Sequence, residues 1–149
     1  MQSHVSEIKI RRMRISDYDA AAEIWLVGGL PYKPNGRDAR ERIAEELKGP
    51  NAIFLVAEMD GKVVGVVLGT HDGRKVWGNR MGVRPGYQRR GIGSALLKEL
   101  ERITGEMGFL VCAALVERDN VASRRMCEKM GYEGHEELMY YVKKKTKDS

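Results

Sequence analysis

An α/β fold is predicted from this sequence, because strand-like and helix-like segments alternate along its 149 residues. Asp60-Gly61 stands between two β-rich runs, Ala52 to Met59 and Lys62 to Leu68, and such a dipeptide is the strongest short signal for a β-hairpin. Farther along, a glycine-rich turn at residues 88–94 separates a strand-like run from a helix-like run. The length and the 42% of hydrophobic residues suit a single domain, residues 1–149, with a substantial core and a short basic tail from about residue 143.

The N-terminal third should contain one strand and two helices. Glu7 to Met13 begins with alternating charged and apolar residues and is expected to be the first strand. The sequence SDYD resembles a capping box in which Asp19 replaces the usual Glu, so a helix should start at Ser16. Residues 28–36 hold three Gly and two Pro and should form a loop, and an amphipathic helix is expected from about Arg37 to Lys48.

The rest of the chain continues the alternation. A strand from Val76 to Val83 should follow the hairpin, and a last strand from Leu138 to Lys144 is expected to pair with one around Tyr132 to His135. Between them the sequence predicts a helix from about Gly91 to Met107, a strand from Phe109 to Val116 and a helix from Val121 to Met130. The predicted order is therefore β-α-α-β-β-β-α-β-α-β-β.

The glycine-rich turn has the features of an anion-binding site. It reads Gln88-Arg-Arg-Gly-Ile-Gly-Ser94 and stands directly before a predicted helix. The first N–H groups of a helix lack intrahelical partners and carry the positive end of its dipole. Gly91 and Gly93 allow a phosphate to approach the backbone, and Arg89 and Arg90 add positive charge. A ligand that carries phosphates is expected here.

Two common phosphate-binding motifs do not fit this turn. A P-loop needs Lys and then Ser or Thr after its second Gly, but Ile92-Gly93 follow Gly91. A dinucleotide fingerprint needs a third small residue and an acid about 20 residues later. Leu96 stands at the third Gly position, and no acid lies around Leu110. The Gln/Arg-x-x-Gly-x-Gly/Ala pattern remains, and it resembles the acyl-CoA pyrophosphate loop of the GNAT acetyltransferase superfamily.

The resemblance extends over roughly residues 76 to 132. Val83 to Arg89 is similar to the family's V-x-P-x-x-Q/R-R approach to the loop. Asn120 to Tyr132 follows most of the family's N-x-x-A/S-x-x-L-Y-E-K-x-G-F helix motif. The resemblance implies a GNAT N-acetyltransferase domain with a mixed, twisted sheet and the element order given above.

The activity that this resemblance implies is transfer of the acetyl group of acetyl-CoA to a primary amine, by direct attack in a ternary complex. Backbone groups near the thioester would stabilise the developing oxyanion. Asn120 would bind the pantetheine arm, and it also suits a plain helix N-cap. The implied cofactor-binding residues are Met81, Gly82, Val83, Gln88, Arg89, Arg90, Gly91, Ile92, Gly93, Ser94 and Asn120.

The sequence departs from the family pattern at Cys127, where relatives often place a Tyr that protonates the leaving thiolate. A Cys has a suitable pKa, near 8.5, but it is shorter, so a packing role is favoured over an acid role. Tyr32, Tyr140 and Tyr141 are alternative proton donors, and the thiolate could also leave without one.

The general base is equally open. The two strands that commonly carry it contain no carboxylate, which leaves Glu58, Asp72 and Glu117 as candidates, or a chain of water molecules. Because the usual acid and base are missing, the alternative is a catalytically silent acyl-CoA-binding module that acts as a sensor or partner domain.

The sequence does not identify the acceptor, because fold does not determine substrate. Glu41, Glu45 and Glu46 could attract a cationic amine, although on an amphipathic helix they are expected to face solvent. The acceptor is a small molecule or a protein, and a homodimer is suggested by the habit of the family.

Composition excludes several classes of protein and site. No apolar run approaches the roughly 18 residues of a membrane span, and the N-terminus lacks a secretory signal, so a cytoplasmic location is expected. Cys112 and Cys127 should be reduced thiols, and the three histidines lie far apart, so no metal site is expected. The net charge of +5 comes partly from the turn and partly from a basic tail, and specific nucleic-acid binding is not expected.

Overall fold

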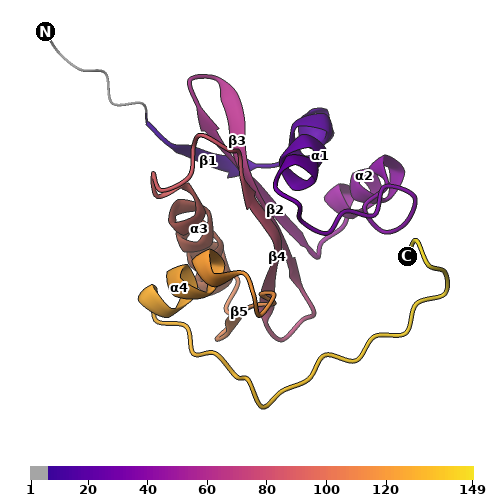
Figure 1. The fold of residues 1–149 in the computed structure, drawn as a ribbon, viewed down its shortest axis with the longest axis vertical. Coiled ribbons are helices and arrows are strands. Elements are labelled where there is room, and N and C mark those ends of the chain that lie inside the picture. Colours follow the sequence, from indigo (N-terminus) through magenta and orange to yellow (C-terminus); the bar gives the residue numbers. More distant parts are fainter. Residues whose placement is uncertain (1–6) are drawn as a thin grey trace, which may run out of the picture.

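The computed structural model describes residues 7–149 and has a five-stranded sheet with helices on both faces (Figure 1). The sheet order is β1-β2-β3-β4-β5, and only the β4–β5 pair is parallel, so the sheet is mixed. The predicted α/β class is confirmed. The elements are β1 (Lys9–Arg12), a 3₁₀ turn (Ile15–Asp17), α1 (Tyr18–Val27), α2 (Arg40–Lys48), β2 (Ala52–Met59), β3 (Lys62–His71), β4 (Val76–Val83), α3 (Ile92–Glu106), β5 (Cys112–Ala114) and α4 (Val121–Lys129).

The two faces of the sheet carry separate apolar cores. In β2, Ile53 and Leu55 point to the cluster that includes α3, while Phe54 and Val56 point to the cluster under α1 and α2. Successive side chains of a strand point to opposite faces, so a strand that is covered on both sides must be apolar at nearly every position. The continuous apolar run of β2 follows from this position in the middle layer.

Close packing of α3 on β3 depends on two glycines. A Cβ at Gly69 would stand 2.6 Å from the Ile53 carbonyl oxygen and 2.6 Å from a Leu100 methyl group. A Cβ at Gly65 would stand 2.7 Å from a methyl group of Ile92, at the first turn of α3. The missing side chains therefore fix how near the start of α3 lies to the sheet.

The helix start near Ser16 differs from its predicted form. Asp17, and not Asp19, bonds back to the chain, and its carboxylate accepts the Arg14 N–H at 2.8 Å. Arg11 holds the same carboxylate at 2.8 Å and Glu58 at 2.7 Å, and its hydrogen bonds lower the pKa of Asp17. The chain enters α1 through this buried ion-pair group, so the predicted capping box is wrong.

Three other predicted elements are shorter than expected. The first strand, predicted from Glu7 to Met13, is limited to Lys9–Arg12. The second helix begins at Arg40 and not at Arg37, because residues 36–39 form turns that bring the buried Asp38 carboxylate to the Lys33 N–H at 2.8 Å. The strand predicted from Phe109 to Val116 is limited to Cys112–Ala114, since the chain leaves β4 after three paired residues.

The two last predicted strands, Tyr132 to His135 and Leu138 to Lys144, are wrong, because this part of the chain contains no strand. After α4 the chain extends across the molecule toward α2 and pairs with no strand (Figure 1). Its end passes Gly36, where the Asp148 carbonyl leaves no room for a Cβ. The observed order is β-α-α-β-β-β-α-β-α.

No helix among residues 7–149 is long and apolar enough to cross a bilayer. The prediction that a secretory signal is absent concerns the N-terminus, whose residues 1–6 lie outside the described residues.

Candidate functional site

The site begins where β4 and β5 separate. The parallel pairing joins Val76 to Cys112 and ends with Gly78 and Ala114, so from Asn79 onward the β5 side of β4 has no strand partner. Directly after this point β4 contains a bulge, since the β3 partners shift between Leu68–Asn79 and Val66–Gly82. Bulges bend a strand and redirect its side chains. The last two strands of the sheet therefore separate, and an opening lies between residues 79–83 and the segment that follows β5.

A hydrogen bond from α1, which covers one face of the sheet, holds the bulge in β4. Arg80 has a φ of 55°, which is unusual for a residue with a side chain. The fully buried Trp25 of α1 donates its indole N–H to the Arg80 carbonyl at 2.8 Å. Arg80 has no partner in β3, so the indole supplies a donor to a carbonyl in the bulge. Helix α1 therefore fixes the shape of β4 at the opening.

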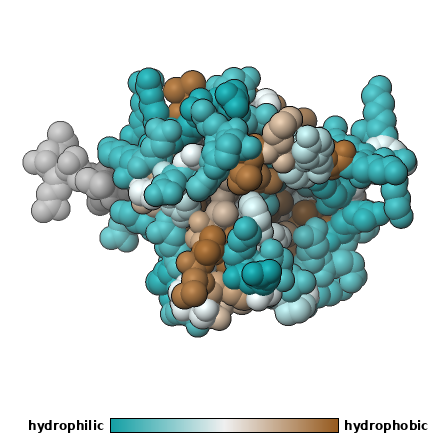
Figure 2. Space-filling view, turned by 90° about the horizontal axis from the view of Figure 1, so that it is seen from below, coloured by the Kyte–Doolittle hydropathy of each residue, from teal (hydrophilic) through white to brown (hydrophobic). Residues whose placement is uncertain are grey.

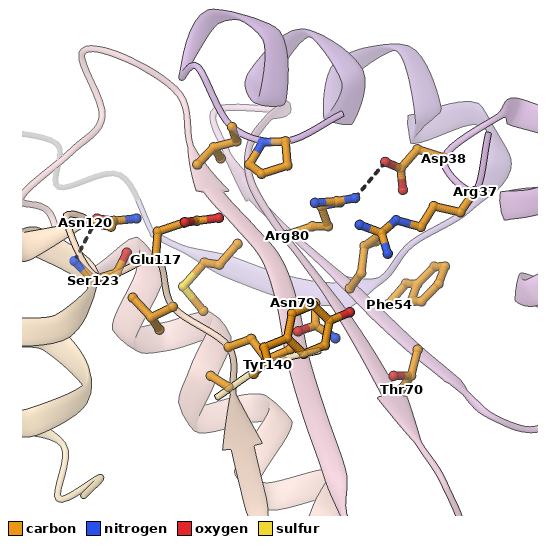
Figure 3. A pocket seen from close by; sticks show the side chains of 18 of the residues that line it. Arg37, Asp38, Phe54, Thr70, Asn79, Arg80, Glu117, Asn120, Ser123 and Tyr140 are labelled. Carbon is orange, nitrogen blue, oxygen red and sulfur yellow. Dashed lines mark hydrogen bonds and ion pairs between the residues drawn. The ribbon is translucent and has the colours of Figure 1, made fainter. Parts of the chain in front are cut away.

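A cavity of about 750 Å³ fills the opening (Figure 3). This volume lies within the usual range of ligand pockets, about 300–1,000 Å³. Its walls come from β2, β3, β4, α2, α3 and α4, from the loop between α1 and α2, from the chain after β5 and from the segment after α4. The lining residues include Asp38, Arg80, Met81, Glu117, Asn120 and Cys127.

The glycine-rich turn lies at the start of α3. Gly91 is the N-cap residue with φ 81°, and Arg89 also has a positive φ, of 65°. The first intrahelical bond runs from the Ala95 N–H to the Gly91 carbonyl at 2.9 Å. Within the described chain, the N–H groups of residues 92–94 have no acceptor, and no side chain caps the helix. The turn therefore presents three free amides.

Positive charge stands beside these amides. Arg89 and Arg90 are exposed, and neither pairs with a carboxylate of residues 7–149. The Arg90 guanidinium lies 5.2 Å from the centre of the Tyr87 ring, an arrangement that orients it through a cation–π contact. Gln88 is exposed in the same turn. These features suit a phosphate-bearing ligand.

The two glycines of the turn have different surroundings. A Cβ at Gly91 would meet nothing within 4 Å, so the backbone there faces open space. A Cβ at Gly93 would stand 3.0 Å from the Met126 sulfur and 3.6 Å from the Met81 sulfur. Gly93 is thus small because α4 packs over it. Since Met81 and Met126 both line the cavity, the turn and the cavity are adjacent.

The predicted strand residues divide between the two sides of β4. Met81 lines the cavity, whereas a Cβ at Gly82 would stand 2.8 Å from an Ile24 methyl group on the α1 side. Val83 packs against the cluster that contains α3. Residues 81–83 all lie on the part of β4 whose backbone edge is not paired with β5.

Asn120 is the N-cap of α4. Its side-chain oxygen accepts the Ser123 N–H at 3.2 Å, which is the ordinary capping bond. The amide nitrogen points into the cavity (Figure 3). Capping therefore leaves the donor half of the side chain available to a ligand.

Cys127 lies about two turns farther along α4 and lines the same cavity. Burial, with smaller effects from Glu128 and Cys112, raises the pKa of its thiol. A raised pKa makes the thiol a weaker proton donor. Both cysteines are free thiols in this structure.

The three candidate carboxylates have different environments. Glu58 is bound in the ion pair with Arg11. Asp72 accepts the N–H groups of Lys75 and Arg74, which lower its pKa to about 2. Glu117 lines the cavity, and its carboxylate has no partner among residues 7–149 (Figure 3). Only Glu117 is placed to meet a ligand in the cavity.

The opposite wall contains an ion pair that sequence reasoning missed. Arg80 reaches Asp38, which is only 3% exposed, at 3.1 Å (Figure 3). Glu46 lines the cavity too, and burial, followed by the charge of Asp38, raises its pKa. No motif marks Asp38, and the only signal was an acid between a Gly/Pro-rich loop and a predicted helix.

The three tyrosines predicted as alternative proton donors lie in different surroundings. Tyr140 lines the cavity, whereas Tyr141 is 84% exposed. The Tyr32 hydroxyl lies 2.9 Å from the Tyr18 hydroxyl, which also donates to the Asp38 carbonyl at 2.6 Å. Residues 7–149 hold no group of three or more His, Cys, Asp or Glu side chains placed to bind a metal ion.

The chain is similar to known acetyltransferases in sequence and in fold. The model of the Acetyltransferase (GNAT) family matches residues 18–132. An acetyltransferase of Photorhabdus laumondii is 34% identical over 138 residues, which cover 92% of this chain and 95% of that protein. Another, from Pectobacterium atrosepticum, is 34% identical over 85% of this chain and 88% of its own length.

Solved structures share the fold. The PaiA N-acetyltransferase from Thermoplasma acidophilum, in complex with coenzyme A, has a TM-score of 0.74 at 24% identity, covering 85% of this chain and 90% of its own. The aminoglycoside N-acetyltransferase AAC(6')-Iy, also with CoA, has a TM-score of 0.77 at 20% identity, covering 96% and 99%. The splayed sheet, the free amides at the start of α3 and the match over residues 18–132 agree, and this chain belongs to the GNAT family of acetyltransferases.

Proposed function

We propose that this chain is an N-acetyltransferase that transfers the acetyl group of acetyl-CoA to a primary amine within a ternary complex. One observation carries the proposal. The free amides of residues 92–94 lie next to the cavity where β4 and β5 separate. A donor held by its phosphates at the turn would extend along the uncovered edge of β4, and its acyl end would reach the cavity.

The surroundings of the turn fit a diphosphate. Open space above Gly91 allows close approach, and Arg89 and Arg90 add charge without a competing carboxylate. The amide nitrogen of Asn120 is a suitable donor to a pantetheine carbonyl, because the oxygen of the same side chain is already used in capping. We assign the backbone of residues 81–83 to the donor's acyl arm, where an N–H would stabilise the developing oxyanion.

The transfer requires a neutral amine. Its nitrogen forms a bond to the acetyl carbon, the carbon–sulfur bond breaks, and the electron pair leaves with the sulfur as coenzyme A thiolate. We assign Glu117 as the base that accepts the amine proton, directly or through water, because its unpaired carboxylate faces the cavity. Glu58 and Asp72 are poor candidates, since their carboxylates are engaged elsewhere.

The leaving thiolate does not depend on Cys127 in this proposal. The raised pKa of that thiol opposes proton transfer to a departing thiolate, whose acid has an ordinary thiol pKa. Cys127 is instead a wall residue of the cavity. Tyr140, which lines the cavity as well, is the better placed hydroxyl.

The acceptor is proposed to be a small-molecule amine. The cavity is a concave site lined by carboxylates and by cationic side chains, which suits a polar small molecule. Among the structural neighbours, one is an aminoglycoside N-acetyltransferase and another was solved in complex with sisomicin. Those acceptors belong to the neighbours, and the shared chemistry is an amine on a polar molecule.

The experiment mixes the purified chain with acetyl-CoA and a panel of polyamines, aminoglycosides and peptide amines, and follows release of free coenzyme A. Amine-dependent release supports the transferase. A chain that binds acetyl-CoA by calorimetry but releases nothing above the blank with any amine is instead the silent acyl-CoA-binding module.

Glu117→Gln tests the base in the same assay, with Glu58→Gln as the matched control. Loss of turnover with unchanged acetyl-CoA binding is expected for Glu117→Gln alone. Equal turnover of the wild-type and Glu117→Gln proteins across the pH profile would remove Glu117 from the mechanism.

A further inference from the structure

The cavity is lined from both faces of the sheet. Leu97 and Met126 belong to the side covered by α3 and α4, whereas Ile43 and Phe54 belong to the side covered by α1 and α2. The free amides of the turn, to which the donor's phosphates are assigned, lie at the start of α3. The part of the cavity on the α1 and α2 face, the acceptor side, therefore remains for the amine.

The acceptor side carries more positive than negative charge. Its cationic side chains are Lys33, Arg37 and Arg80, and its acidic ones are Asp38 and Glu46. The Asp38 carboxylate accepts the backbone N–H of Lys33 at 2.8 Å and a guanidinium N–H of Arg80 at 3.1 Å. The charge of Asp38 is thus compensated within the protein, so this carboxylate is not a free anionic site for a cationic acceptor.

Arg37 brings a charge that no acid of the described chain compensates. It is exposed, and its guanidinium forms no ion pair or hydrogen bond with residues 7–149. Figure 3 shows its side chain extending from the loop between α1 and α2 into the cavity. The Arg80 guanidinium forms one hydrogen bond with the same part of the chain, to Asp38. Guanidinium groups present their donors in a planar fork that matches a carboxylate.

The backbone that carries Arg37 is held in place. The Asp38 N–H donates to the Lys33 carbonyl at 3.1 Å, and the Tyr18 hydroxyl donates to the Asp38 carbonyl at 2.6 Å. A binding group on a fixed backbone loses less freedom when a ligand binds than one on a mobile loop. Arg37 is therefore well placed to bind an anionic group in the cavity.

Apolar side chains complete the acceptor side, and they include Ile43, Phe54 and Leu68. Figure 2 views the molecule from below, the side along which the chain after α4 runs in Figure 1, and shows mainly hydrophilic residues with smaller hydrophobic areas between them. Two residues of that chain, Tyr140 and Lys144, line the cavity. A molecule with an apolar body and polar ends fits these surroundings.

We propose that the acceptor amine carries a carboxylate at its other end, which Arg37 binds while the amine lies near Glu117. This inference rests on the proposed acetyl transfer and names the class of acceptor for it. Glu117 and Arg37 lie on opposite sides of the cavity in Figure 3, so the two ends of one molecule would face them. The excess positive charge of the acceptor side matches one carboxylate, whereas Lys33 and Arg37 would repel a polycationic amine.

Matched pairs of amines test the carboxylate. The probes are para-aminomethylbenzoate and ε-aminocaproate, each compared with the amide in which the acid group is neutral. Release of coenzyme A gives kcat/KM for each probe, and saturation-transfer NMR with coenzyme A present compares binding without transfer. The wild type should favour each acid over its amide by about tenfold, the lower end of the effect of a charged hydrogen bond.

Arg37→Gln should bring the ratio of acid to amide close to one in both measurements. The matched control is Arg42→Gln, because Arg42 is an exposed arginine of α2 that does not line the cavity, and it should keep the wild-type ratio. Equal use of acid and amide by the wild type would overturn the inference, as would a wild-type ratio in Arg37→Gln. Weaker acetyl-CoA binding in Arg37→Gln would overturn it too, since Arg37 would then hold the donor.

Failure of this inference differs from failure of the proposed transfer. A chain that releases no coenzyme A with any amine is not the proposed transferase, and the NMR ratio still tests whether Arg37 binds a carboxylate. Release with amines that lack a carboxylate, and none with the acids, would support the transferase and overturn the inference about its acceptor.

Discussion

Replacing Gly91 by Ala tests the turn at the start of α3. Gly91 has a φ of 81°, and a Cβ there would meet no atom within 4 Å. A left-handed conformation costs a residue with a side chain roughly 1–2 kcal/mol, and no clash adds to this. For a domain of this size such a loss lowers the melting temperature by about 2–8 °C. The variant should therefore remain folded and lose only part of its stability.

Gly105→Ala is the matched control in the same helix. Gly105 has no positive φ, and a Cβ there also meets nothing within 4 Å. Alanine is favoured over glycine inside a helix by about 0.5–1 kcal/mol, so this variant should be slightly more stable than the wild type. Opposite signs for the two substitutions, measured by urea unfolding, would confirm that backbone conformation is the cause.

Acetyl-CoA affinity separates the ligand role of the turn from its stability. If the free amides hold the diphosphate, Gly91→Ala should displace at least one charged hydrogen bond, worth about 1.5–3 kcal/mol. Calorimetry should then show binding weakened by about tenfold or more, with Gly105→Ala unchanged. Wild-type affinity in Gly91→Ala would refute the assignment of the diphosphate to this turn.

Three further predictions use other parts of the site. Trp25→Phe removes the donor to the Arg80 carbonyl and should lower the free energy of unfolding by about 1–3 kcal/mol, measured in urea; unchanged stability would mean that the bulge does not need this bond. Cys127→Ala should keep appreciable turnover at unchanged acetyl-CoA affinity, and loss of turnover alone would make the thiol the acid. The lowered pKa of Asp72, about 2 against 3.8, gives stability that is complete above pH 4 and lost as the pH falls toward 2. Asp72→Asn should lack this dependence in acid unfolding, and identical curves would contradict it.

Local sequence signals determined much of the fold. The bounds of β2 and β4 agree with the predicted Ala52 to Met59 and Val76 to Val83, because β-rich runs ended by Gly, Pro or Asp leave few alternatives. Helices α3 and α4 are each within one residue of their predicted ends. The sequence also predicts the glycine-rich turn, since free amides at a helix start follow from local backbone structure alone.

The strand predictions after α4 were wrong because they too used only local sequence signals. Strand propensity shows that residues 138–142 can form a strand, but a strand exists only where another backbone pairs with it. The sequence contains no information on whether that partner belongs to the same chain. In the structure none does among residues 7–149.

The sequence by itself determined the class of the fold, the family resemblance and the position of the glycine-rich turn, all of which depend on neighbouring residues. The tertiary structure decided where β4 and β5 part, how Trp25 holds the bulge at Arg80, and that Glu117 faces the cavity opposite Asp38. These features join residues that are far apart in the chain. Their energies arise only when the core packs, so no local pattern records them.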